Sequence, residues 1–156
     1  MNPALELRAL RGATTASANS TEAIDAAVSE LVAALMAHNR LQASQLLSIT
    51  FSVTADLDAC FPAGIARRRL GCEGVALLDC QQMAVQGDLQ RCIRLLAHAW
   101  LAAEQIPVHP YLREASRLRP DRALADASHT SVTTPAGAWD PAGTAPLSPA
   151  GDPADH

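Results

Sequence analysis

The positions of apolar residues predict an alternation of strands and helices along the first part of the chain. From Leu5 onward polar and apolar residues alternate, which predicts a strand with Leu5, Leu7 and Ala9 on its apolar face. Continued by two residues, the alternation places Arg11 on that same face. Gly12 then permits a turn into the polar stretch ATTASANS, where we expect the strand to have ended.

The next segment has the pattern of an amphipathic helix. Asn19 is followed three residues later by Glu22, which is the spacing of a capping box. Apolar residues then recur on one helical face up to about Asn39, namely Ile24, Val28, Leu31, Val32, Leu35 and Met36. We therefore predict a helix with Asn19 as its N-cap.

Shorter elements follow. Residues 47–53 alternate in polarity and predict a half-buried strand, residues 63–70 predict a short helix ended by Gly71, and residues 74–78 predict a short buried strand. Residues 89–100 fit a helix or a strand, because leucine and alanine favour a helix while the length suits both. A last strand is expected before the LRPD motif at 118–121.

Composition divides the chain into one domain and a tail. With 156 residues, the chain is long enough for one domain with a hydrophobic core. Five of the ten prolines lie beyond residue 126, among glycine, alanine, serine and threonine. Such a segment buries too little apolar surface to offset its ordering entropy. We predict a folded domain at 1–125 and a disordered C-terminal tail at 126–156.

Several classes of function are disfavoured. No run of about 18 apolar residues could cross a membrane, and MNPALELR does not resemble a secretory leader, so we expect a cytoplasmic protein. The formal charge of −4 argues against nucleic-acid binding. The four cysteines form no C-x-x-C pair, and no histidine lies at metal-ligand spacing, so we expect no metal site and no cofactor.

Arginine is the residue type that points to chemistry. All 12 basic residues are arginines, which excludes lysine-based covalent catalysis and suits bidentate binding of carboxylates. Arg94 lies in an apolar sequence, beside Ile93, Leu95 and Leu96. A guanidinium in such surroundings needs an anion. The residues alone leave open whether this anion is a ligand or an acidic side chain of the same subunit, and the same holds for Arg11.

Three segments carry a resemblance to a known family. LRGATT at 10–15, CFPAGIAR at 60–67, and GDLQRCIR at 87–94 with LRPD at 118–121 are together similar to the AroH class of chorismate mutases. The resemblance covers about residues 5–122 and implies an α+β fold, in which a mixed β-sheet packed with helices assembles into a homotrimeric pseudo-α/β-barrel. It also implies isomerisation of chorismate to prephenate, between subunits and without a cofactor or metal.

The resemblance implies a role for each of several positions. Arg94 would donate to the breaking ether oxygen, Arg11 would bind a substrate carboxylate, and Gln82 stands where the family has a glutamate that accepts from the ring hydroxyl. The other positions expected to bind substrate are Phe61, Ala63, Arg67, Leu77, Leu78, Asp79, Tyr111 and Arg119.

Three of the matching positions depart from the family pattern. Gln82 can accept a hydrogen bond but carries no charge, Asp79 replaces a cysteine, and Gly64 replaces a lysine. Asp79 could restore the missing charge from a shifted position, or it is simply an exposed residue at the end of a strand.

These departures leave two alternatives beside chorismate mutase activity. The first is an AroH-like enzyme that acts on another chorismate-derived enolpyruvyl ether. The second is a trimer without catalytic activity that binds small carboxylates through its arginines.

Overall fold

The computed structural model of the protein describes residues 2–122. Its four strands form one mixed sheet, made of β1 (Leu5–Thr15), β2 (Leu46–Val53), β3 (Ala76–Gln81) and β4 (Cys92–Ala102). The strand order is β1-β4-β2-β3, with β4 antiparallel to both of its neighbours and β2 parallel to β3. This mixed sheet with helices confirms the α+β class. The predicted tail at 126–156 lies outside the described residues.

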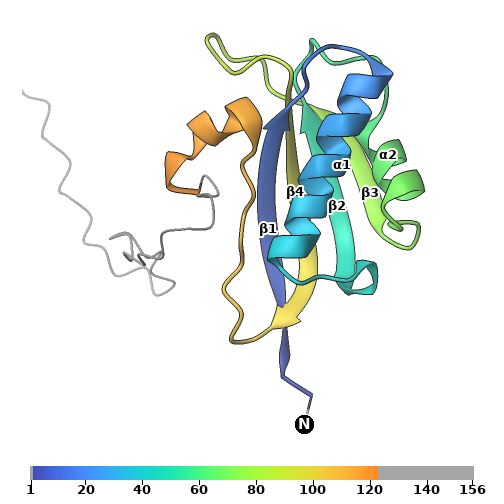
Figure 1. The fold of residues 1–156 in the computed structure, drawn as a ribbon, viewed down its shortest axis with the longest axis vertical. Helices are drawn as coiled ribbons and strands as arrows, with labels where there is room; N and C mark the ends of the chain where they lie inside the picture. Colours follow the sequence, from blue (N-terminus) through green and yellow to red (C-terminus); the bar gives the residue numbers. More distant parts are fainter. Residues whose placement is uncertain (1, 123–156) are drawn as a thin grey trace, which may run out of the picture.

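Two α-helices cover one face of this sheet, as Figure 1 shows. They are α1 (Thr21–His38), between β1 and β2, and α2 (Pro62–Arg69), between β2 and β3. Three 3-10 helices complete the described part, namely η1 (Ala43–Gln45), η2 (Arg113–Leu118) and η3 (Pro120–Arg122). No helix of the described range has the length and apolar character that a membrane span requires.

The hydrophobic core lies between the sheet and the two helices. Leu10, Ile49, Phe51 and Ile93 project from three strands toward the helices, and each is 0% exposed. The apolar stripe predicted for the first helix meets them, since the side chains of Ile24, Val28, Leu31, Val32 and Leu35 are buried. The structure thus confirms the predicted helix that extends to about residue 39 and the predicted strand at 47–53.

The turn predicted at Gly12 is wrong, because β1 continues through it to Thr15. A Cβ atom at Gly12 would lie 3.1 Å from Leu31 Cδ1 and 3.1 Å from the carbonyl oxygen of Pro110. Glycine is therefore needed here for the close approach of neighbouring chain segments and not for a turn.

The predicted helix start is also wrong by one residue. Ser20 is the N-cap, and its Oγ accepts a hydrogen bond from the Ala23 N–H at 3.2 Å. Asn19 instead bridges to a distant loop, where its Oδ1 accepts from the N–H groups of Asp58 and Ala59. Asn19 is of a residue type that often caps helices, but here its side chain makes a tertiary contact. Its spacing from Glu22 did not indicate this contact.

Two other elements differ from the prediction, and the segment at 89–100, for which helix and strand were both left open, is a strand from residue 92 onward. It overlaps β4, which the sheet holds by pairing on both sides. The strand β3 starts later than predicted and is largely exposed, because it lies at a sheet edge with a partner on one side only. The strand expected before LRPD is absent from the described residues. That segment forms η2, preceded by a single bridge between Tyr111 and Ala13.

The second face of the sheet carries no α-helix of residues 2–122, and we refer to it as the open face. The alternation predicted for β1 is correct, but its apolar side lies on this face, where Leu5 is 53% and Leu7 51% exposed. Large apolar residues of the other strands extend the exposed surface, namely Leu78, Leu96 and Trp100. Near Ala13, one end of the face is covered by a small cluster of Leu89, Tyr111, Ala115 and Leu118.

Candidate functional site

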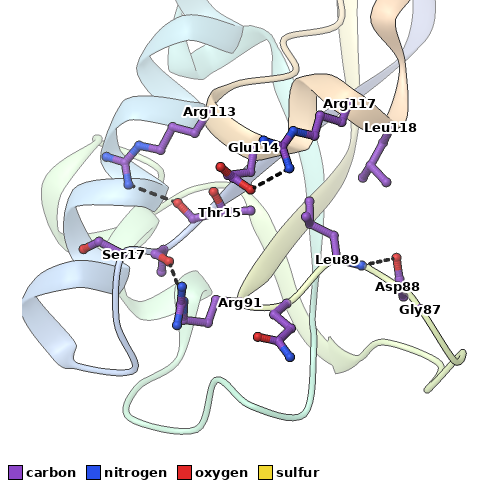
Figure 2. Close-up of a pocket in the computed structure, with 12 residues that line it drawn as sticks. Thr15, Ser17, Gly87, Asp88, Leu89, Arg91, Arg113, Glu114, Arg117 and Leu118 are labelled. Atoms are coloured by element: carbon purple, nitrogen blue, oxygen red, sulfur yellow. Dashed lines mark hydrogen bonds and ion pairs between the residues drawn. The ribbon is translucent and has the colours of Figure 1, made fainter.

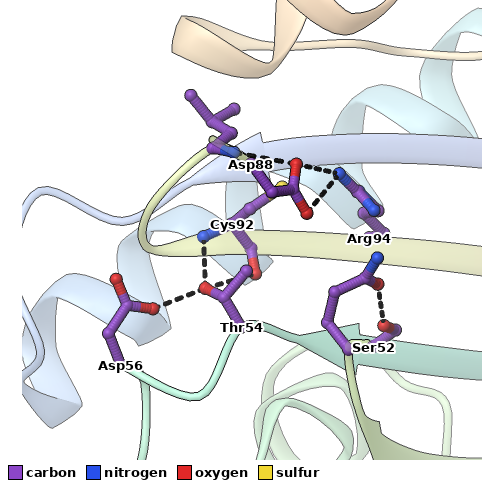
Figure 3. Close-up of polar contacts among 8 residues, drawn as sticks. Ser52, Thr54, Asp56, Asp88, Cys92 and Arg94 are labelled. Atoms are coloured by element: carbon purple, nitrogen blue, oxygen red, sulfur yellow. Dashed lines mark hydrogen bonds and ion pairs between the residues drawn. The ribbon is translucent and has the colours of Figure 1, made fainter. Parts of the chain in front are cut away.

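Arg94 lies on β4 and points to the open face. Ala13 on β1 and Ser52 on β2 are its register partners, and they form one row across the sheet. Its Nη2 donates to both carboxylate oxygens of Asp88, at 2.9 Å to Oδ1 and 3.3 Å to Oδ2 (Figure 3). The sequence left open whether the anion that meets Arg94 is a ligand or an acidic side chain of the same subunit. In the isolated chain it is the carboxylate of Asp88.

The loop between β3 and β4 holds Asp88 in place. Gly87 adopts a φ of 81°, a conformation that favours glycine, and the Asp88 N–H donates to the Val85 carbonyl at 3.1 Å. The N–H of Leu89 donates to Asp88 Oδ1 at 2.8 Å, and the Leu89 side chain packs against the cluster around Tyr111. The loop is thus anchored on both sides of the carboxylate.

Gln82 lies on the same face of the sheet as Arg94, directly after β3, and the strand β2 lies between the two residues. Its N–H continues the pairing of β3 with β2 by donating to the Val53 carbonyl at 2.7 Å. Its side-chain Oε1 accepts from Ser52 Oγ at 2.5 Å, and Ser52 is the register partner of Arg94. Ser52 therefore lies between Arg94 and Gln82, which are two of the three residues expected to be catalytic together with Arg11.

Three further predicted residues lie on the edge strand β1 or in the segment that follows β4 and runs beside it. Arg11 shares the open face with Leu96, and its N–H donates to His109 Nδ1 at 2.9 Å. Tyr111 pairs with Ala13, two residues further along the strand. Arg119 makes two hydrogen bonds to Asp121, at 2.9 and 2.7 Å.

Three arginines lie near the half-buried imidazole of His109 at this edge. Burial, together with the charges of Arg122, Arg11 and Arg119, lowers the pKa of His109 to about 4. A neutral imidazole whose Nδ1 accepts a hydrogen bond carries its proton on Nε2. The region around Arg11 therefore suits a bound anion.

Most of the remaining predicted residues line a groove of about 900 Å³ at the start of α2, and Leu77 and Leu78 lie outside it. Phe61, Ala63, Gly64 and Arg67 contribute from the helix and its N-cap, and Asp79 contributes from β3. Phe61 is 75% exposed at the rim. Leu77 packs against the hydrophobic core, whereas Leu78 is exposed on the open face.

Asp79 contacts α2 and forms no hydrogen bond with Arg94, Arg11 or Arg119 within residues 2–122. Its Oδ1 accepts from the Ala63 N–H in the first turn of the helix, at 3.0 Å. Burial raises the pKa of this carboxyl, while the Ala63 hydrogen bond and the charge of Arg67 act against that rise. Its register partner is the buried Phe51, so Asp79 faces the helix side of the sheet and points away from Arg94 of its own chain.

The predicted residues thus form two separate groups in one chain. Within residues 2–122, no hydrogen bond or ion pair joins the groove residues to Arg94, Arg11 or Arg119. Asp88, Ser52 and His109 were not predicted from the sequence. Asp88 lies within the motif GDLQRCIR, but the motif alone gives no sign that its loop folds back onto Arg94.

A cavity of about 780 Å³ between the β3–β4 loop and η2 is also rich in arginine (Figure 2). These arginines already have partners in the chain. Arg113 pairs with Glu30 at 2.7 Å, Arg117 with Glu114 at 3.2 Å, and Arg91 Nε donates to the Ala16 carbonyl at 3.1 Å. Their contacts fix η2 and the loop against β1 and α1.

Comparison with known proteins identifies the family. Residues 7–122 match the family model of type I chorismate mutases, which spans almost all of the described structure. The chain belongs to this family.

Individual relatives agree with that assignment. The chain is 42% identical over 117 residues to the chorismate mutase AroH of Thermus thermophilus, covering 74% of this chain and 95% of that protein. It is 32% identical over 119 residues to the AroH protein of Bacillus subtilis, covering 76% and 94%. A solved chorismate mutase from Clostridium thermocellum superposes with a TM-score of 0.65 at 36% identity, covering 70% of this chain and 98% of that one.

Proposed function

We propose that this protein is a chorismate mutase, which converts chorismate to prephenate by an intramolecular rearrangement. The observation that carries the proposal is the placement of Arg94 beside Gln82 on the open face, in a chain of the type I family. The reaction breaks an ether bond and forms a carbon–carbon bond within one molecule, so it needs no nucleophile, cofactor or metal. The protein has to hold the reactive conformer and stabilise the charge that develops on the ether oxygen.

The arginines supply that charge stabilisation. Arg94 donates to the ether oxygen, and its partly buried position strengthens this interaction relative to one in water. Arg11 binds a carboxylate of the substrate, assisted by Arg119 and Tyr111 beside the same strand. Gln82 accepts from the ring hydroxyl through its amide oxygen, in place of its present bond from Ser52.

The active site is completed by a second copy of the chain in a homotrimer. The two separate groups of predicted residues support this assembly, because the groove around Phe61 and Ala63 needs a partner surface that carries Arg94 and Arg11. The exposed apolar residues of the open face, Leu5, Leu7, Leu78, Leu96 and Trp100, provide the contact area. A cytoplasmic location stays a prediction.

The neutral side chain of Gln82 favours one alternative. An enzyme for a related enolpyruvyl ether would need a different hydrogen-bond partner for a different ring substituent, and Gln82 offers an N–H₂ donor as well as an acceptor. Such an enzyme would leave chorismate unchanged and consume another member of the class.

The direct test is to mix purified protein with chorismate, follow the loss of its diene absorbance, and identify the product by mass and retention time against prephenate. We expect saturable formation of prephenate. Unchanged chorismate in the presence of a folded assembly would contradict the proposal, and consumption of another enolpyruvyl ether in the same assay would establish the alternative.

A further inference from the structure

The carboxylate of Asp88 leaves most of the Arg94 guanidinium available. Both of its oxygens contact the same nitrogen, Nη2, at 2.9 and 3.3 Å. In residues 2–122, Nε and Nη1 of Arg94 form no hydrogen bond or ion pair with an oxygen atom. Asp88 can therefore hold one end of the guanidinium while the other two nitrogens face a bound anion.

Asp88 is itself fixed before any ligand binds. The Leu89 N–H holds Oδ1 at 2.8 Å, the Val85 carbonyl accepts from the Asp88 N–H, and Leu89 anchors the loop in the cluster with Tyr111. The Asp88 side chain is 19% exposed and that of Arg94 is 26% exposed. At this degree of burial the pair is less screened than a surface ion pair.

The other polar neighbours of Arg94 on the open face carry no charge. Ser52 is its register partner, and Gln82 reaches it only through the hydroxyl of that serine. Asp79 projects to the helix side of the sheet. Asp88 is thus the one acidic side chain in residues 2–122 that is ion-paired with Arg94.

From these contacts we propose that Asp88 is a positioning residue of the reaction, which orients the Arg94 guanidinium and supplies the negative charge that balances it. The proposal rests on the proposed function. It assigns to the β3–β4 loop a part of the active site that lies outside the residues predicted from the sequence.

The substitution Asp88→Asn tests this assignment, because asparagine keeps the shape and the acceptor for the Leu89 N–H but removes the charge. We expect kcat for chorismate to fall by about tenfold or more while KM changes by less than about threefold, as for a loss of orientation in the reacting complex. Asp25→Asn is the matched control. Asp25 lies on α1, away from the open face, and its side chain is similarly buried. Its carboxylate pairs with Arg69 of α2 at 2.8 Å.

A second substitution separates a charge effect from a general loss of structure. Gln82→Glu places a carboxylate next to Ser52, on the other side of Arg94. In the Asp88→Asn background it should raise kcat by about fivefold or more, a larger factor than the same substitution gives with Asp88 present, and this non-additivity is expected of coupled neighbours.

Three outcomes would overturn the proposal. They are a kcat that Asp88→Asn leaves unchanged, a kcat/KM that it raises, as for a carboxylate that competes with substrate, and additive effects of the two substitutions.

Failure of the proposed function is recognised separately, by absence of chorismate turnover in the unsubstituted protein. In that case the arginine side-chain NMR signals of Arg94 still test the pairing. They should exchange faster with solvent in Asp88→Asn, and identical exchange in both proteins would refute the positioning role.

Discussion

The two faces of the sheet differ in what completes them. On the helix-covered face, Leu10, Ile49 and Phe51 are fully buried by segments of their own chain. On the open face, Leu5, Leu7 and Leu96 remain about half exposed, and Arg11 and Arg94 lie among them. One chain is therefore enough to form the core but not to cover the surface that carries the arginines. We infer that folding depends on the helix-covered face, whereas the arginines act on the open face of the same four strands.

The largest expected effect on stability is the difference between alanine substitutions at two leucines of β1. Leu10 is 0% exposed on the covered face, and Leu7 is 51% exposed on the open face. Leu10→Ala should lower the free energy of unfolding by about 3 kcal/mol or more, because it leaves a cavity in the core. Leu7→Ala should leave unfolding of the dissociated chain nearly unchanged and weaken assembly. Urea denaturation together with analytical ultracentrifugation measures both quantities. Equal losses of stability at concentrations where the chain is dissociated would contradict the division between the faces.

On the open face, the largest expected effect on activity comes from Arg94→Ala. Without its guanidinium, the transition state should lose about 3 kcal/mol or more of stabilisation, a decrease of at least roughly 100-fold in kcat/KM. The assembly should stay folded by circular dichroism. Arg117→Ala is the control, since that side chain is 74% exposed and its one ion pair within residues 2–122 is with the neighbouring Glu114 on η2. Full activity of Arg94→Ala would show that the reaction takes place elsewhere.

A smaller effect is expected at His109, which holds the backbone of Arg11 at the edge of the open face. Its pKa of about 4 in the folded protein lies below the ordinary value of about 6.5, so the unfolded chain binds more protons between these values. This histidine should therefore reduce stability as the pH falls from about 6.5 to 4.

Replacement by glutamine, which can still accept from the Arg11 N–H, should flatten this pH dependence in urea denaturation series. His38→Gln, at the end of α1, provides the control substitution. A pH dependence that His109→Gln leaves unaltered would rule out the buried histidine as its source.

Local patterns predicted most of the fold. The alternation of β1 and β2 and the apolar stripe of α1 depend on the period of each element, which the sequence contains directly. The error at Gly12 and the ambiguity at 89–100 arose where tertiary contacts decide. Gly12 serves a close approach of Pro110 and Leu31, and the segment left open between helix and strand becomes part of β4 because two strands pair with it. The residues that pack against Gly12 and the strands that pair with β4 are far away in the sequence, so the local pattern does not reveal them.

The site was less predictable than the fold. The apolar neighbours of Arg94 and Arg11 and the motifs made these arginines candidates, but the acid that pairs with Arg94 was not predicted. Asp88 reaches Arg94 through a glycine turn and an anchored leucine, so its role depends on the path of a loop. The polarity pattern also cannot say which face of a strand its own chain covers, and it therefore did not reveal that the apolar face of β1 is open.

The central claim is that chorismate is converted at a site shared by two copies of the chain. Coexpression of Arg94→Ala with the groove variant Phe61→Asp, each carrying a different tag, tests it most directly. Each variant alone should be nearly inactive. In each purified mixed trimer one of the three sites should combine an intact Arg94 from one copy with an intact groove from another, so about one third of the unsubstituted activity should return. Mixed assemblies that show no more prephenate formation than the two parents would contradict a shared site.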